Sequence, residues 1–178
     1  GNPLGANGVR YLQAFAASST AASLERELPH PLDSTKPASV HGVFTHALLE
    51  GLKKGTNLEG KVDSASLAGY VKERAQELMP ADDNQRPDFR FDDTQFIDFG
   101  FGQLTPVQVN LTTPAAGFQV RFGKDISKVV HRTSSSATAA VSLKLAPGRY
   151  LFAAPGDGDQ FLNSTLVKVL GEPISVNL

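Results

Sequence analysis

Cysteine is absent from all 178 residues. The chain therefore has no disulfide, no thiolate zinc site and no thiol nucleophile of its own. This absence does not distinguish compartments, because reducing and oxidising locations both tolerate proteins without cysteine.

A long hydrophobic run is also missing. No stretch of about 18 apolar residues occurs, so the sequence predicts no transmembrane helix. The opening residues, GNPLGANG, lack the basic and apolar regions of a signal peptide. The chain begins with Gly1 rather than methionine, which is typical of a processed product or an excised segment.

Neither sign of charge dominates. The net charge of −1 argues against a general nucleic-acid binder. Residues 1–104 hold 10 Lys and Arg against 14 Asp and Glu, whereas residues 105–178 hold 7 against 4. So small an asymmetry indicates two domains rather than a charged ligand.

Helical spacing marks two segments of the first half. Gly55 ends the first helix after two lysines, Asp63 or Ser64 can cap the second, and Pro80 ends it. Around these helices, we expect a buried strand (or a short helix) at 9–19, a loop at 29–40 and a strand at 96–101. The apolar faces should be Phe44, Ala47, Leu48 and Leu52 in the first helix, and Leu67, Tyr70, Val71, Ala75 and Leu78 in the second.

From Pro106 onward, apolar residues alternate with polar ones. Two strands should flank the turn Pro147-Gly148, and a Ser/Thr/Ala-rich stretch at 133–140 should be a mobile loop. Six or seven short strands without a helix signal predict a β-sandwich over 105–178, joined to the first half at 102–106. The expected inward residues include Val107, Val109, Leu111, Phe118, Val120 and Phe122.

Motifs for metal or serine chemistry are missing. His41 and His46 are not at the i, i+4 spacing of a helical metal pair, and no Gly-x-Ser-x-Gly motif occurs. The segment 56–67 and the turn at 157–159 offer too few oxygen ligands for calcium. We therefore expect no metal and no cofactor.

The strongest signal is HGVFTHALLEGL at 41–52. A His-Gly pair before Phe-Thr and a Leu-Leu-x-x-Leu run resembles the first small-subunit helix of bacterial caspase-like cysteine peptidases. Residues 16–25 resemble the family's small-subunit strand and specificity loop. Residues 60–71 resemble the next helix, and the Gln-x-Pro at 85–87 resembles its ending. These ordered matches cover about half of the chain.

The resemblance implies an α/β fold for residues 1–104, namely the small-subunit half of a caspase-type α/β sandwich. An all-β sandwich would follow at 105–178, where the pattern at 143–150 resembles carboxypeptidase regulatory-like modules. The catalytic His and Cys of the family lie in the large subunit, so this chain would hold none. His41 is a further candidate general base, although a role at the start of the helix is favoured.

The main partner implied is the large subunit of the same precursor, because the strand and helices would otherwise leave an apolar face uncovered. A second copy of the chain is the other option. Members of the family often cut themselves between the two parts, and a start at Gly1 fits such autoprocessing.

Ser23, Leu24 and Glu25 are the predicted substrate-binding residues, because TAASLERE at 20–27 occupies the place of the family's specificity loop. Aspartate-specific animal caspases have a positive residue there, whereas this chain has Glu25 and Glu27 around Arg26. Carboxylates favour Arg or Lys at the cleavage position through charge-assisted contacts. A solvated charged loop is the alternative.

The sequence thus predicts the small subunit of a caspase-like cysteine endopeptidase that acts on a peptide or protein substrate. Its sandwich would recognise partners or serve as a scaffold. The alternative is a non-catalytic caspase-like regulatory or adhesion module that acts through the sandwich. A cytoplasmic location is favoured, and a secreted or periplasmic one stays open.

Overall fold

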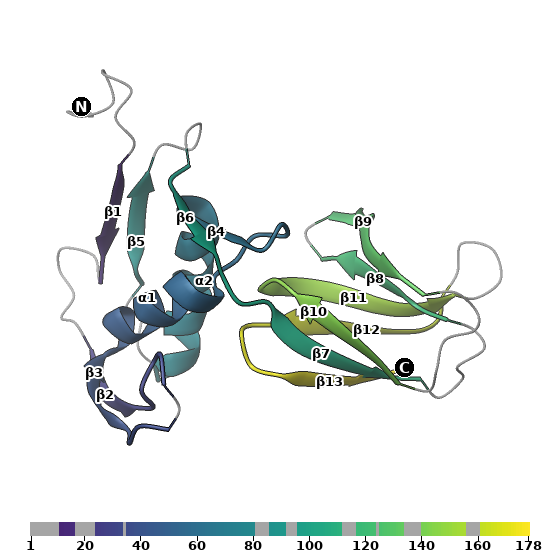
Figure 1. The fold of residues 1–178 in the computed structure, drawn as a ribbon, viewed down its shortest axis with the longest axis horizontal. Coiled ribbons are helices and arrows are strands. Elements are labelled where there is room, and N and C mark those ends of the chain that lie inside the picture. The colour runs from purple at the N-terminus through teal and green to yellow at the C-terminus, as the bar shows by residue number, and fades with distance from the viewer. Residues whose placement is uncertain are drawn as a thin grey trace. The chain divides into compact units, whose positions relative to one another are not determined.

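The chain divides into two compact units, residues 1–103 and 104–178, and each is described by itself (Figure 1). The chain is rich in β-structure, with two helices among the described residues. The structure is a computed structural model, and it describes residues 11–16, 24–33, 35–80, 86–91, 96–111, 117–123, 125–133, 140–155 and 161–178.

The first unit combines helices α1 (Val43–Lys54) and α2 (Ser64–Leu78) with three antiparallel strand pairs. Figure 1 shows β1 and β5 side by side near the helices. In the part of the chain described, neither helix has the length and apolarity needed to cross a lipid bilayer. The strand pairs are β1 (Leu12–Phe15) with β5 (Asp88–Phe91), β2 (Glu25–Leu28) with β3 (Ser39–Gly42), and β4 (Lys61–Asp63) with β6 (Asp98–Phe101).

Helix α2 confirms its predicted start and its predicted face. The Asp63 carboxylate accepts the backbone N–H of Ser66 at 2.7 Å, and the Ser66 hydroxyl accepts the backbone N–H of Asp63 at 2.9 Å. This capping box satisfies two N–H groups that have no partner inside the helix. The predicted residues Leu67, Tyr70, Val71 and Ala75 are buried.

Helix α1 spans the predicted residues, and three of its four predicted apolar residues, Phe44, Ala47 and Leu48, pack in or against the core; the prediction was wrong for Leu52. Leu52 is 43% exposed, whereas His46 and Glu50 are buried beside Ala47. The buried side of the helix extends to Glu50, which finds cationic partners inside the fold, and to Gly51, which allows α2 to approach closely. A Cβ at Gly51 would lie 2.8 Å from Leu67 Cδ1, too close for any real contact.

The core of the first unit lies between the two helices and the strands beside them. Both helices and the strands β2, β4 and β5 contribute buried apolar residues to it. Leu12 and Ala14 of β1 pack against this core from its edge. The buried members are Leu28, Val43, Ala47, Val62, Leu67, Ala68, Val71, Ala75, Met79 and Phe89.

The second unit consists of two sheets around one core, in the order β10-β7-β13 and β12-β11-β8-β9. Strands β7 and β13 are parallel, and all other neighbours are antiparallel. The strands are β7 (Thr105–Asn110), β8 (Gln119–Phe122), β9 (Asp125–Arg132), β10 (Ala140–Leu145), β11 (Gly148–Pro155), β12 (Phe161–Val169) and β13 (Ile174–Asn177).

Alternation predicted the inward residues of this unit well. Val107, Val109, Phe118 and Val120 are at most 1% exposed. Tyr150 is fully buried, its hydroxyl donates to the Ala146 carbonyl at 2.8 Å, and burial raises its pKa to about 12. The sequence reading missed β9, since its segment DISKVVHR is charged and largely exposed. Of the loop predicted at 133–140, residues 134–139 lie outside the described residues and Ala140 begins β10; the turn at 157–159 also lies outside the described residues.

Removal of the cap of α2 should destabilise the first unit. Asp63→Ala leaves the Ser66 N–H without its acceptor, so we expect the free energy of unfolding to fall by about 1–2 kcal/mol. Urea unfolding followed by far-ultraviolet circular dichroism measures this change. Gln76→Ala, at an exposed position of the same helix, is the matched control and should change stability by less than about 0.5 kcal/mol. Equal losses in the two variants would contradict the capping role.

Candidate functional site

Two of the three predicted substrate-binding residues, Leu24 and Glu25, lie at the start of the β2–β3 hairpin. Leu24 is half-buried against the core, and its carbonyl accepts the backbone N–H of Val43 at 2.9 Å. This bond fixes the hairpin to the first residue of α1. Glu25 begins β2, is exposed, and lies opposite Gly42 of β3. Ser23 lies outside the described residues.

The strand geometry separates the three charges of β2. Successive side chains of a strand point to opposite faces, so Glu25 and Glu27 share one face and Arg26 occupies the other. An Arg26 guanidinium N–H donates to the Leu78 carbonyl at the end of α2, where the helix dipole favours a cation. Among the described residues, neither glutamate has an ion-pair partner. The two carboxylates are therefore open to a ligand.

A row of histidines runs from the hairpin to α1. The rings of His30 and His41 are 6.5 Å apart, and those of His41 and His46 are 6.2 Å apart. His41 lies on β3 and hydrogen-bonds the Ser39 hydroxyl at 2.8 Å through Nε2. A nucleophile–base pair would also need a group that orients the histidine. Among the described residues, no carboxylate hydrogen-bonds His41, so an orienting group of this kind is not found there.

Glu50 is the centre of a buried ion cluster between the helices. Its carboxylate contacts Arg74 Nε of α2 at 2.7 Å and Lys54 Nζ at 3.1 Å, and His46 Nε2 is 3.6 Å away. Burial alone would raise the pKa of Glu50, but Arg74 and Lys54 outweigh it and hold that pKa below its ordinary value. The cluster links α1 to α2 beside the inner end of the histidine row.

Burial lowers the pKa of His46 below its ordinary value. Glu50 opposes this decrease, whereas the positive charge of Arg74, with His41 and Lys54, adds to it. His46 is 2% exposed, and its Nδ1 has no hydrogen-bond partner among the described residues. The ring is thus held neutral at pH 7.

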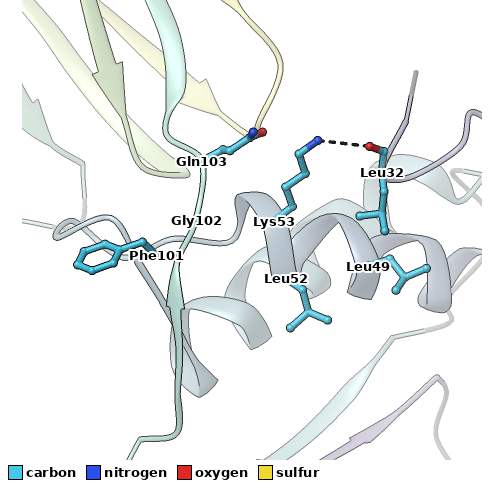
Figure 2. A pocket seen from close by; sticks show the side chains of 7 residues that line it. All are labelled: Leu32, Leu49, Leu52, Lys53, Phe101, Gly102 and Gln103. Atoms are coloured by element: carbon cyan, nitrogen blue, oxygen red, sulfur yellow. Dashed lines mark hydrogen bonds between the residues drawn. The ribbon is translucent and has the colours of Figure 1, made fainter. Parts of the chain in front are cut away.

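A shallow hollow of about 430 Å³ lies beside the C-terminal part of α1 (Figure 2). Figure 2 shows Lys53 extending towards the Leu32 carbonyl, which its ammonium meets at 3.4 Å, while Phe101 points away from them. Phe101 is 81% exposed. The lining residues are Leu32, Leu49, Leu52, Lys53, Phe101, Gly102 and Gln103.

Close backbone packing fixes the floor of this hollow. The backbone N–H of Gln103 donates to the Lys53 carbonyl at 2.7 Å, and that of Gly102 donates to the Gly60 carbonyl at 3.0 Å. A Cβ at Gly102 would lie 2.6 Å from Thr56 Cγ2, so only glycine fits. None of the predicted substrate residues that the structure describes lines the hollow. Lys53 is the charged side chain among the described lining residues, and it would repel a basic ligand.

In the part of the chain described, no group of three or more His, Asp or Glu side chains could hold a metal ion. Asn57 lies in the segment that offers too few ligands for calcium, and it braces its own turn. Its amide oxygen accepts the N–H groups of Glu59 and Lys61, and its amide N–H donates to Asp63 at 2.8 Å.

Sequence reasoning missed the Glu50 cluster and the hollow. The i, i+4 spacing of His46, Glu50 and Lys54 was a visible signal for the cluster, but Arg74 lies on another helix.

No protein-family model, no curated protein and no solved structure matches this chain. The family resemblance and the substrate-binding role of Ser23, Leu24 and Glu25 therefore stay predictions.

Neutralising Glu50 should destabilise the first unit. Glu50→Gln leaves the Arg74 and Lys54 cations without their carboxylate in a buried site, so we expect the free energy of unfolding to fall by about 2–4 kcal/mol. Urea unfolding measures the loss. Glu77→Gln, which alters the 38% exposed carboxylate beside the same arginine, is the control and should cost under about 1 kcal/mol. A smaller loss for Glu50→Gln than for the control would contradict this account.

The stability of the first unit should fall in mild acid. His46 has an ordinary pKa of 6.5 in the unfolded chain and a lower one when buried, so only the unfolded chain takes up the proton as the pH falls through 6.5. The contribution of the neutral ring is fully present above pH 6.5 and is lost below it. Urea midpoints measured on either side of this pH report the loss.

His46→Gln should reduce this pH dependence, because it removes the group that binds the extra proton on unfolding. His30→Gln changes a histidine at the outer end of the row and should leave the dependence in place. An unchanged slope in His46→Gln would refute the assignment.

Proposed function

We propose that this chain is the small-subunit part of a caspase-like cysteine endopeptidase. A large subunit would supply the catalytic His and Cys, and the chain would shape the substrate groove with Ser23, Leu24 and Glu25. The observation that carries this proposal is the pairing of β1 with β5, two strands separated in sequence by both helices. The order of a strand followed by two helices is the one that the motifs at 16–25, 41–52 and 60–71 imply for a small subunit.

The β1–β5 pair supports the need for a partner. The pair packs against the helical core, but the edge of a sheet presents unpaired backbone groups that can accept a further strand. Within the described residues, β1 and β5 pair with no third strand, and Phe15 of β1 is 43% exposed. A large subunit that continues the sheet would satisfy the free backbone groups and cover the exposed ring.

The hairpin supports a role in peptide recognition. Glu25 and Glu27 lie on one exposed face of β2, and Arg26 is held on the other face by the Leu78 carbonyl. A basic side chain of a substrate would therefore meet carboxylates without competition from Arg26. The hollow beside Lys53 does not offer this chemistry, so the large subunit would have to complete the pocket.

The second candidate function is a non-catalytic module that acts through the β-sandwich. The exposed apolar side chains Leu162 and Leu166 on the outer strand β12 favour it, because both could contact another protein. The two candidates differ in one requirement: the peptidase needs a segment that carries His and Cys.

Joint expression of the chain with the Cys- and His-bearing segment of its gene tests the peptidase. The assembly should cleave fluorogenic peptides after Arg or Lys, and replacement of the catalytic cysteine by alanine should abolish cleavage. Glu25→Gln should raise the KM for Arg substrates about tenfold, since one charge-assisted contact is lost, and should leave kcat nearly unchanged.

Glu59→Gln, an exposed residue outside the hairpin, is the control and should leave KM unchanged. Preferential cleavage after Asp would overturn the basic specificity. A gene without any segment that carries His and Cys would overturn the peptidase itself and leave the non-catalytic module.

A further inference from the structure

The two sheets of the second unit have four outer strands, and three of them are protected against pairing with another chain. Strand β13 has only four residues. Strand β9 carries Asp125, Lys128 and Arg132, and its register with β8 shifts twice. Strand β10 places Lys144 among its exposed positions. Short length, charge and irregular register are the features by which proteins protect sheet edges.

Strand β12 has less of this protection. It has nine residues, FLNSTLVKV, and its single charge is Lys168 near the C-terminal end. Within the described residues its only paired neighbour is β11, so its other edge presents free backbone groups. Leu162 is 76% exposed and Leu166 is 63% exposed. A long apolar edge of this kind either aggregates or has a partner.

The register of β12 is regular over most of the segment where a partner would add. From Asn163 to Val169 every residue is paired with β11 without a shift, and the one irregularity skips Leu162, between Asn163 and Phe161. Leu166 lies opposite Leu151 of β11, which is half-buried. A strand added outside β12 with an apolar residue at this level would extend an existing apolar row across the sheet.

We propose that β12 is a dimerisation edge that pairs antiparallel with β12 of a second copy of this chain. A two-fold axis at Ser164 would set Leu162 of each copy opposite Leu166 of the other. The pattern Leu-x-Ser-x-Leu is symmetric about Ser164, so one arrangement satisfies both open edges and both pairs of leucines. The two four-stranded sheets would join into one continuous sheet.

The chemistry of the strand favours a copy of itself over a foreign strand. No charged residue lies between Phe161 and Val167, so the edge has no charge with which to select a different partner. Lys168 lies outside the symmetric pattern, so the two lysines do not face each other across the axis. The proposal is independent of the peptidase activity, because it uses no residue of the first unit.

The absence of native cysteine makes cross-linking a direct test of the register. Ser164→Cys would set two cysteines opposite each other, within the Cα separation of about 4.4–6.8 Å that a disulfide requires. Mild oxidation of the full chain should then give a covalent dimer on a non-reducing gel. Ser127→Cys, at an exposed position on the opposite edge strand β9, is the control and should remain monomeric. Equal cross-linking of both variants, or none with Ser164→Cys, would overturn the proposal.

Sedimentation velocity over a range of concentrations tests the same interface without a cross-link. The unmodified chain should show a monomer–dimer equilibrium, and Leu166→Lys should raise its dissociation constant at least about tenfold, because lysine would replace both apolar contacts. Ile126→Lys on β9 changes a side chain of nearly equal exposure, 62% against 63%, and should leave dimerisation unchanged. A chain that is monomeric throughout, or that forms assemblies larger than dimers, would refute the closed pair.

Hydrogen exchange provides a readout that needs no substitution. Backbone amides of β12 should become more protected as the concentration of the chain increases, because their free N–H groups would enter the ladder of the second copy. Amides of β9 should exchange at the same rate at every concentration. Protection that appears in the first unit instead would place the interface elsewhere and overturn the proposal.

Discussion

The first unit depends on the contact between Glu50 of α1 and Arg74 of α2. This carboxylate is buried, and it can remain charged there because Arg74 and Lys54 compensate for the lost hydration. On the same helix His46 is buried beside Glu50, whereas Leu52 is exposed. The position of the β2–β3 hairpin depends on the same helix, because the hydrogen bond from the Val43 N–H to the Leu24 carbonyl ties the hairpin to the start of α1.

The second unit is held together by a different kind of interaction. It has no buried ion cluster among the described residues, and its core is a layer of apolar side chains contributed by both sheets. Tyr150 brings a polar group into this apolar core, and its buried hydroxyl donates a hydrogen bond to the Ala146 carbonyl. Each unit thus has its own core, so substitutions in one unit should affect the stability of the other little. The substrate hypothesis concerns the first unit, and the dimer hypothesis concerns the second.

Local patterns predicted much of this fold. The bounds of both helices, the Asp63 cap and the inward residues of β7 and β8 follow from signals within a few residues of each other. Strand β9 was missed because an exposed edge strand with charges does not need the apolar alternation that reveals a strand. The substrate-binding role of Leu24 and Glu25 stays a prediction, because local pattern did not reveal the bond from Val43 to the Leu24 carbonyl or the bond that turns Arg26 towards Leu78.

The sequence by itself determined where most of the elements lie, because helix caps, spacing and alternation are local and need no knowledge of the partner surface. The lack of cysteine likewise followed from the sequence alone and excludes a thiol nucleophile in this chain. Only the tertiary structure decided that Glu50 of α1 is buried, because a charged residue is accommodated in the core when its counterion comes from another helix, 24 positions away in the sequence. It also decided that β12 is an outer strand, since strand order depends on long-range pairing that no local pattern encodes.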